Sequence, residues 1–322
     1  MKAACYEQTG PAREVLRVTE LDRPEPGPGQ VRVRVAVSGI NPTDVAARDG
    51  STPRPIEGFQ IPHHDGVGTI DAVGDGVSPD RVGQRVWVWF AATGRFGTAA
   101  QWSVIPEQQA VVLPDAVSDD LAASLGIPAM TAHRCLFADG PLDGGAVLIA
   151  GGAGAVGHFA IQLAHHDGAR VVATISSQEK AELARAAGAE TVVNYRDGDA
   201  AEQIRTVAPQ PDRIVEVAPA ANLEMDVSLA GPATTVVSYA AGSTDPTLPV
   251  RDCMTANVTL RFVLVYNVPA PALQQAAEAI TGALTDGSLT TLPTHRFPLD
   301  EVAGAHEAVE SGVTGKVVIE LP

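Results

Sequence analysis

Cysteine and lysine are scarce in this sequence of 322 residues, since each occurs only three times. The cysteines Cys5, Cys135 and Cys253 are far apart and form no Cys-x-x-Cys pair. A zinc cluster built on cysteines is therefore excluded by its ligand count. We expect three free thiols that serve as small core residues.

Positive charge is scarce as well, because 22 lysines and arginines stand against 38 aspartates and glutamates, which gives a net charge of -16. A chain this acidic repels nucleic acid and anionic membranes, so neither is an expected partner. No apolar run reaches the about 18 residues of a membrane-spanning helix. The first residues also lack the apolar stretch of a signal peptide, and a cytoplasmic enzyme is expected.

The length and a hydrophobic content of 45% predict a globular chain with two domains. The first third contains short segments that alternate apolar and polar residues and are separated by Gly and Pro turns. Strands are predicted at residues 31–37, 67–73 and 85–90. Strands at this spacing are typical of a small antiparallel barrel.

From residue 146 onward the pattern changes to alternating strands and helices. The predicted strands cover residues 146–150, 169–174, 191–194, 213–217, 234–239 and 258–266, and a last strand covers 316–321. The clearest helices are predicted at 156–164, 179–187 and 272–285. This order predicts an α/β fold with a parallel, doubly wound sheet, the Rossmann arrangement.

A glycine loop follows the first of these strands. Gly152, Gly154 and Gly157 match the pattern G-x-G-x-x-G between a strand and a helix. Glycine permits a sharp turn, close approach of the backbone to a diphosphate, and tight packing of the helix on the strand. A purely structural turn is the alternative. We predict that a dinucleotide contacts the loop at Gly152, Ala153, Gly154, Ala155 and Val156.

The end of the second strand of this unit selects the nucleotide. Enzymes that use NAD usually carry an acidic residue there, which binds the ribose hydroxyl. This chain has Ser176 and Ser177 instead, followed by Lys180, and Tyr195 ends the neighbouring strand. These side chains can bind a ribose phosphate, which favours NADPH over NADH. The alternative for Lys180 is a solvated helix face.

Further motifs are spread along nearly the whole chain. They are Gly-Ile-Asn-Pro-Thr-Asp at 39–44, Asp-Gly-Val-Gly at 65–68, Val-Gly-Gln-Arg-Val at 82–86, Gly-Ile-Pro-Ala-Met-Thr-Ala-His-Arg at 126–134 and Thr-Gly-Lys at 314–316. With these motifs the chain resembles the medium-chain dehydrogenase/reductase superfamily, and within it the zinc-free, zeta-crystallin-like quinone oxidoreductases. The resemblance implies a GroES-like β-barrel domain, residues 1–125 and 267–322, with a Rossmann domain, residues 126–266, inserted. It also implies a homodimer, for which the apolar strand at 259–266 could pair edge to edge.

The same resemblance places the three zinc-ligand positions of the zinc-dependent members at Asn41, His64 and Ile127 or Pro128. One histidine does not make a tetrahedral site, so no metal is expected. Without a Lewis acid, the hydride acceptor must already be electrophilic. Quinones and conjugated enones meet this condition, because hydrogen bonds can stabilise the anion that hydride transfer forms.

The resemblance also implies the remaining site residues. Asn41 and Asp44 are the predicted catalytic residues, and Asn41 can also contact the cofactor. Cofactor contacts are further implied at Thr131, Val217, Tyr239, Ala240, Val263 and Val265. A tyrosine that family members carry shortly after an Arg-x-Gly is missing after Arg48, so water is the simpler proton source.

The aromatic side chains Phe59, Trp87, Trp89 and Phe96 could form a flat pocket for an aromatic substrate, or they could belong to the barrel core. We therefore expect a small hydrophobic substrate, aromatic or with a conjugated carbonyl. Three functions stay open: an NADPH-dependent quinone or enone reductase, an enoyl reductase of a biosynthetic pathway, and an NADPH-binding redox sensor or structural protein with little turnover.

Overall fold

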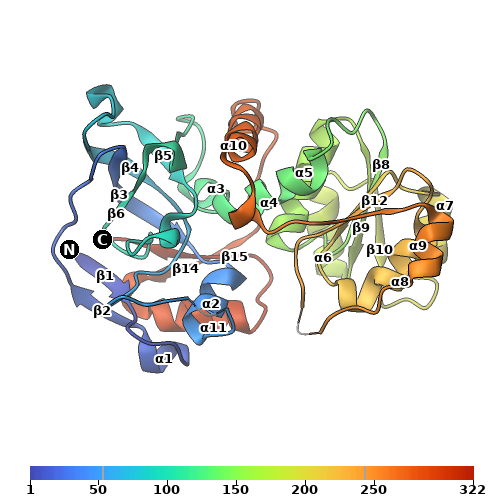
Figure 1. Cartoon of the computed structure of the whole chain (residues 1–322), viewed down its shortest axis with the longest axis horizontal. Coiled ribbons are helices and arrows are strands. Elements are labelled where there is room, and N and C mark those ends of the chain that lie inside the picture. The colour runs from blue at the N-terminus through green and yellow to red at the C-terminus, as the bar shows by residue number, and fades with distance from the viewer. Residues whose placement is uncertain (53, 243) are drawn as a thin grey trace. The chain divides into compact units, whose positions relative to one another are not determined.

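The computed structural model describes residues 1–52, 54–242 and 244–322. The chain divides into two compact units, shown with their elements in Figure 1. The first unit comprises Met1–Ile127 and Pro293–Pro322, and the second comprises Pro128–Leu292.

The second boundary therefore lies well beyond the predicted one at residue 267, and helix α10 (Ala270–Thr285) falls in the second unit. The segment after α10 is tied to helix α5 (Ala155–His166) of that unit. The Thr290 amide donates to Oε1 of Gln162 over 2.6 Å. Nε2 of Gln162 donates in return to the Thr290 carbonyl over 3.2 Å. These side-chain contacts leave no trace in local periodicity.

The first unit is built on a seven-stranded sheet with the order β14-β15-β3-β4-β5-β7, and β6 also pairs with β3. The strands are β3 (Gln30–Gly39), β4 (Asp65–Val73), β5 (Arg85–Val88), β6 (Trp102–Pro106), β7 (Ala110–Val112), β14 (Thr294–Pro298) and β15 (Lys316–Glu320). All pairs are antiparallel except β14 with β15. A two-stranded sheet of β1 (Lys2–Cys5) and β2 (Arg17–Glu20) accompanies it.

The alternation predicted in β3 is what buries this strand. Val31, Val33, Val35 and Val37 are all buried, as the period of two requires. The C-terminal strand β15 pairs with the end of β3, where Val318 lies opposite Gly39. A side chain at Gly39 would lie 1.9 Å from the Ala123 carbonyl, so only glycine allows this close approach.

The remaining elements of the first unit are short. Its helices are α1 (Ala12–Val15), α2 (Pro42–Asp49), α3 (Asp119–Ala122) and α11 (Val302–Glu310). Trp87 and Trp89 are buried, so they belong to the barrel core, which was one of the two alternatives for these side chains. Phe59 and Phe96 form an edge-to-face pair with ring centroids 6.2 Å apart.

The second unit contains a six-stranded parallel sheet with the order β10-β9-β8-β11-β12-β13. Its strands are β8 (Ala146–Ile149), β9 (Arg170–Ile175), β10 (Thr191–Asn194), β11 (Arg213–Glu216), β12 (Thr235–Ser238) and β13 (Thr259–Phe262). This is the Rossmann order 3-2-1-4-5-6, and it confirms the predicted fold class. The order reverses between β8 and β11, and ligands of such sheets bind where the strands end on either side of that point.

Helices cover both faces of this sheet. The helices of the second unit are α4 (Gly126–Phe137), α5, α6 (Gln178–Ala186), α7 (Ala200–Val207), α8 (Pro219–Leu229), α9 (Val250–Ala256) and α10, and the last of these does not lie on the sheet. Figure 1 shows α5 and α6 on one side of the sheet and α8 and α9 on the other. The predicted strand at 258–266 is too long, because the ladder ends with the bond from Val263 N–H to the Ser238 carbonyl. Val265–Asn267 then form a short 3-10 helix, η4. Among the described residues, no helix is both long and apolar enough to cross a bilayer.

Candidate functional site

The glycine loop joins β8 to α5 through contacts that exclude side chains. Gly151 makes the turn with a φ of 70°, which favours glycine. A Cβ on Gly157 would lie 2.3 Å from the Gly151 carbonyl oxygen, and one on Gly152 would lie 2.8 Å from Cβ of Ala173. The turn therefore rests on Gly151, which precedes the matched pattern, while Gly152 and Gly157 allow close packing.

The N-terminus of α5 is open toward the end of the sheet. Gly154 is the N-cap and offers no side chain as a cap, and the first amide bonded within this helix is that of His158, which donates to the Gly154 carbonyl over 2.8 Å. The N–H groups of Ala155, Val156 and Gly157 therefore have no acceptor inside the helix. Together with the helix dipole, they form a cradle for a phosphate group.

The residues predicted to read the ribose lie together at the ends of β9 and β10. Ser177 caps α6, since its Oγ accepts from the Lys180 amide over 3.3 Å. The Tyr195 amide donates to the Ile175 carbonyl over 3.0 Å, which places Tyr195 beside the residue that precedes Ser176. The Tyr195 ring is half exposed. Ser176, Ser177 and Lys180 thus follow the end of β9, and Tyr195 follows the neighbouring strand β10. No acidic residue stands in β9 or in the two positions after it.

Thr174 was not predicted and yet supports the same loop. Its Oγ1 accepts from the Gly151 amide over 3.3 Å, and its carbonyl accepts from the Gly152 amide over 3.0 Å. A threonine next to the last position of β9 gives no sequence signal for this contact, because Gly151 lies in the loop after another strand.

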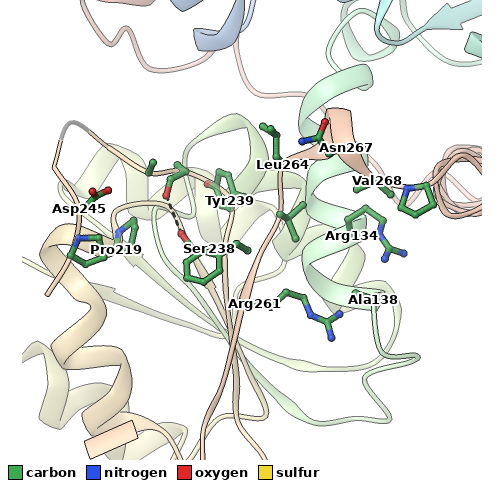
Figure 2. A pocket seen from close by; sticks show the side chains of 16 residues that line it. Arg134, Ala138, Pro219, Ser238, Tyr239, Asp245, Arg261, Leu264, Asn267 and Val268 are labelled. Carbon is green, nitrogen blue, oxygen red and sulfur yellow. Dashed lines mark hydrogen bonds between the residues drawn. The ribbon is translucent and has the colours of Figure 1, made fainter. Parts of the chain in front are cut away.

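A cavity of about 690 Å³ lies at the ends of β12 and β13, as Figure 2 shows. Tyr239, Ala240 and Val263, three of the predicted cofactor contacts, line it together with Arg134 and Asn267. Burial is the main cause that raises the pKa of Tyr239 well above its usual range, and the nearby Cys135 and Glu216 add to it. Its hydroxyl therefore keeps its proton at neutral pH.

The other predicted contacts lie around this region of the second unit. A Cβ on Gly151 would lie 3.1 Å from Cγ1 of Val217, so Val217 packs against the glycine loop. Val265 is buried in η4, and Thr131 is buried in α4. Their roles as cofactor contacts stay predictions.

The first unit holds a buried polar cluster of Asn41, Asp44, Asp65 and Lys316. Nδ2 of Asn41 donates to Asp65 Oδ2 over 2.8 Å, and Nζ of Lys316 donates to Asn41 Oδ1 over 2.7 Å. Nζ of Lys316 also lies 3.4 Å from Asp65 Oδ2. The Asn41 amide donates to Asp44 Oδ2 over 2.8 Å and closes the capping box of α2.

The pKa values in this cluster follow from burial and from the charges it contains. Burial and then the charge of Asp65 raise the pKa of Asp44 to about 7. Burial raises the pKa of Asp65, and Lys316 opposes this effect. Burial lowers the pKa of Lys316, and the two carboxyls oppose it. Ion pairing thus compensates for burial, as a buried charge requires.

The cluster determines what the two predicted catalytic residues can do. The Asn41 amide group is used by Asp65 and Lys316 and is only 2% exposed, and Asp44 is equally buried. Their catalytic roles stay predictions. Asp65 and Lys316 were not predicted as site residues, although Lys316 is one of three lysines and both lie in quoted motifs.

Buried histidines lie near this cluster, and the bonds of His63 join it to a serine and to another histidine. Nε2 of His63 lies 2.9 Å from Nε2 of His306, and Oγ of Ser38 lies 2.8 Å from Nδ1 of His63. Burial lowers the pKa of His63 well below its usual range and that of His64 to about 3, so both rings are neutral. Within the described residues, no three His, Cys, Asp or Glu side chains form a group that could hold a metal ion.

Comparison with known proteins identifies the class to which this fold and site belong. Residues 27–115 match the alcohol dehydrogenase GroES-like domain, and residues 155–282 match the zinc-binding dehydrogenase family. The chain is thus a medium-chain dehydrogenase/reductase. The two matches fall in the first and the second unit respectively.

Within this class the chain belongs to the quinone oxidoreductase family, and it is an oxidoreductase. It is 30% identical to the quinone oxidoreductase of Pseudomonas aeruginosa over 95% of both chains. It is 29% identical to the human quinone oxidoreductase over 98% of this chain and 96% of that one. A mycobacterial structure in complex with NADPH superposes with a TM-score of 0.86 and 28% identity, over 99% of this chain and 100% of that one.

The buried cluster yields a test of stability. Replacing Lys316 by Met should lower the free energy of unfolding by about 3–5 kcal/mol, because Asp65 is left as an uncompensated buried charge. All three tryptophans lie in the first unit, so their fluorescence during urea unfolding reports on this unit.

Adding Asp65→Asn to Lys316→Met should restore part of the loss, because position 65 then carries no unpaired charge. Lys2→Met, at an exposed lysine of the same unit, is the control and should change little. Equal effects of Lys2→Met and Lys316→Met would contradict the role of the ion pair.

Proposed function

We propose that this protein is an NADPH-dependent, zinc-independent reductase that transfers hydride to a quinone or to an alkene conjugated with a carbonyl. The grouping of Ser176, Ser177, Lys180 and Tyr195 around the acid-free end of β9 carries this proposal. The relative that binds NADPH supports it.

The second unit offers a place for each part of the cofactor. The open N–H groups at the start of α5 would hold the diphosphate, and Lys180 with the two serines would hold the ribose phosphate. The cavity lined by Tyr239, Ala240 and Val263 would take the nicotinamide end. When bound, NADPH supplies the hydride, and the protein contributes position and hydrogen bonds.

The donor groups of the first unit do not fit a tetrahedral zinc site. Of the three expected ligand positions, His64 alone carries a side chain that binds zinc well. Asn41 is held by Asp65 and Lys316, and the Ile127 amide donates to Asp65 Oδ1 over 2.7 Å. Without a Lewis acid to polarise it, the hydride acceptor would have to be electrophilic already.

Three further features of the proposal concern its surroundings. We propose a small hydrophobic substrate, aromatic or with a conjugated carbonyl. We place the protein in the cytoplasm, because Cys5, Cys135 and Cys253 are free thiols, as in most proteins of reducing compartments. We also propose a homodimer, whose surface is described below.

Oxidation of NADPH with para-benzoquinone, phenanthrenequinone, a short enone and a crotonyl thioester tests the activity. We expect turnover with a quinone or the enone, which the loss of NADPH absorbance measures. Preference for the thioester would favour an enoyl reductase. Binding of NADPH without turnover on any acceptor would contradict the reductase and favour a binding protein.

Replacing Lys180 by Ala tests the choice of nucleotide. The Michaelis constant for NADPH should rise at least about tenfold, because a charge-assisted hydrogen bond to the ribose phosphate is lost. The constant for NADH should not change. Arg185→Ala, which removes a positive charge from the last turn of the same helix, is the control. A similar effect of Lys180→Ala on both nucleotides would refute the phosphate contact.

The surface for a second copy is the edge of the Rossmann sheet. Among the strands formed by residues 1–52, 54–242 and 244–322, β12 alone pairs with β13, so the outer edge of β13 offers free ladder positions. Apolar side chains near it are exposed to an unusual degree, among them Phe262 and Met254 at 76% each and Leu264 at 56%. An edge strand with exposed apolar side chains favours pairing with an identical strand about a twofold axis.

Replacing Phe262 by Asp should shift the protein toward the monomer, because two carboxylates would face each other near the axis. Light scattering after size-exclusion chromatography measures the molar mass. Val207→Asp, at another exposed apolar residue of the same unit, should leave the mass unchanged. A wild-type protein that runs as a monomer at all concentrations would contradict the dimer.

A further inference from the structure

Two carboxyl groups are buried side by side in the second unit, and the proposed reaction uses neither of them. Glu216 is the last residue of β11, and Asp226 lies in the third turn of α8. They are 0% and 1% exposed. Two ionised carboxylates buried in contact would repel each other, so one of the two has to keep its proton at neutral pH.

Glu216 is held by donors from the turn that follows it. Its Oε1 accepts from the Ala218 amide in a short hydrogen bond. Nδ2 of Asn222 lies 3.1 Å from both carboxylate oxygens. These bonds suit an ionised carboxylate, and they fix the conformation of residues 217–219 between β11 and α8.

Asp226 has the opposite environment. Among the described residues, no N–H or O–H group donates to either of its carboxyl oxygens. Burial, and then the charge of Glu216, raises the pKa of Asp226 to about 9. Asn222 binds the Glu216 carboxylate and lies four residues before Asp226, so the two residues share one face of α8 and Asp226 faces Glu216 as well. With its raised pKa, Asp226 keeps its proton at neutral pH, and a hydrogen bond from it to Glu216 would leave one negative charge shared by the pair.

The turn that Glu216 fixes is in contact with the glycine loop. Cγ1 of Val217 lies 3.1 Å from the position of a Cβ on Gly151, the residue that makes the turn of the loop. The Glu216 carbonyl also accepts from the Tyr239 amide over 3.2 Å, at the wall of the large cavity. Glu216 thus contacts Tyr239 at the cavity proposed for the nicotinamide, and its neighbour Val217 contacts the glycine loop proposed for the diphosphate.

We propose that protonated Asp226 is a positioning residue for nucleotide binding. Through its hydrogen bond to Glu216, it holds the 217–219 turn against Gly151 and so keeps the glycine loop ready for the diphosphate. This inference rests on the proposed function for the identity of the nucleotide, but not for the order of the loop.

Other charges around α8 do not substitute for Glu216. Helices α7 and α9 pack against α8. Their ionisable groups are Glu202 and Arg205, which pair with each other at the surface, and Arg251, Asp252 and Cys253. Glu224 of α8 itself is exposed. The charge that acts on Asp226 is that of Glu216.

Asp226→Asn is the central variant, because an amide can donate to Glu216 but cannot lose a proton. At pH 7, its dissociation constant for NADPH, measured by fluorescence titration, should equal that of the wild type. Above about pH 9 the wild type should bind NADPH more weakly as Asp226 ionises, and Asp226→Asn should not. The maximal rate at saturating NADPH should stay the same in both.

Asp226→Ala removes the donor and should weaken NADPH binding about tenfold at pH 7. Hydrogen exchange of the amides at 151–157 without nucleotide should be faster in Asp226→Ala and unchanged in Asp226→Asn. Glu224→Gln, an exposed change in the same helix, is the control for both measurements.

The pH dependence of the free energy of unfolding tests whether Asp226 carries a proton in the folded protein. Between about pH 4, the range of a free aspartate, and about pH 9, the folded protein binds a proton that the unfolded chain has released. The free energy of unfolding of the wild type should therefore fall relative to Asp226→Asn as pH rises through this window. A constant difference between the two proteins would overturn the proposal.

Loop exchange that is equal in the wild type and Asp226→Ala would overturn the positioning role. So would a loss of NADPH affinity in Asp226→Ala that Asp226→Asn shares at pH 7. A wild type that binds no NADPH, while exchange and stability behave as expected, would refute the proposed function and leave the positioning role supported.

Discussion

The contact between Gly157 and the Gly151 carbonyl is the constraint on which the second unit depends. It allows α5 to begin directly against the end of β8, and this places the open N–H groups of the helix at the point where the strand order reverses. Any side chain at Gly157 would separate helix and strand. Val217 and Thr174 contact the same Gly151 and support the loop there.

Burial of charge organises both units in the same way. In the first unit, Lys316 compensates Asp65 and holds Asn41 by a hydrogen bond. In the second, Asp226 solves the same problem by keeping a proton next to Glu216. Both arrangements lie next to residues proposed for function. A buried charge needs exact partners, and exact partners also fix the backbone around them.

Much of this could be predicted from the sequence because it is local. The alternation in β3, the glycine pattern after β8 and the Ser-Ser-x-x-Lys segment after β9 each lie within a few residues. They predicted the strands and helices in these places, and the nucleotide contacts stay a prediction. The length of β13 was wrong, because the apolar residues beyond Phe262 continue the strand pattern while the ladder partner has ended.

The sequence by itself determined the class of fold, the glycine loop and the set of side chains available for chemistry, since these depend on short-range patterns and on glycine geometry. Only the tertiary structure decided that α10 belongs to the second unit. It alone brought Lys316 to Asp65, 251 residues away, and Asp226 to Glu216. Such contacts join different elements, and the energy of a buried polar group depends on those partners rather than on its neighbours in the chain.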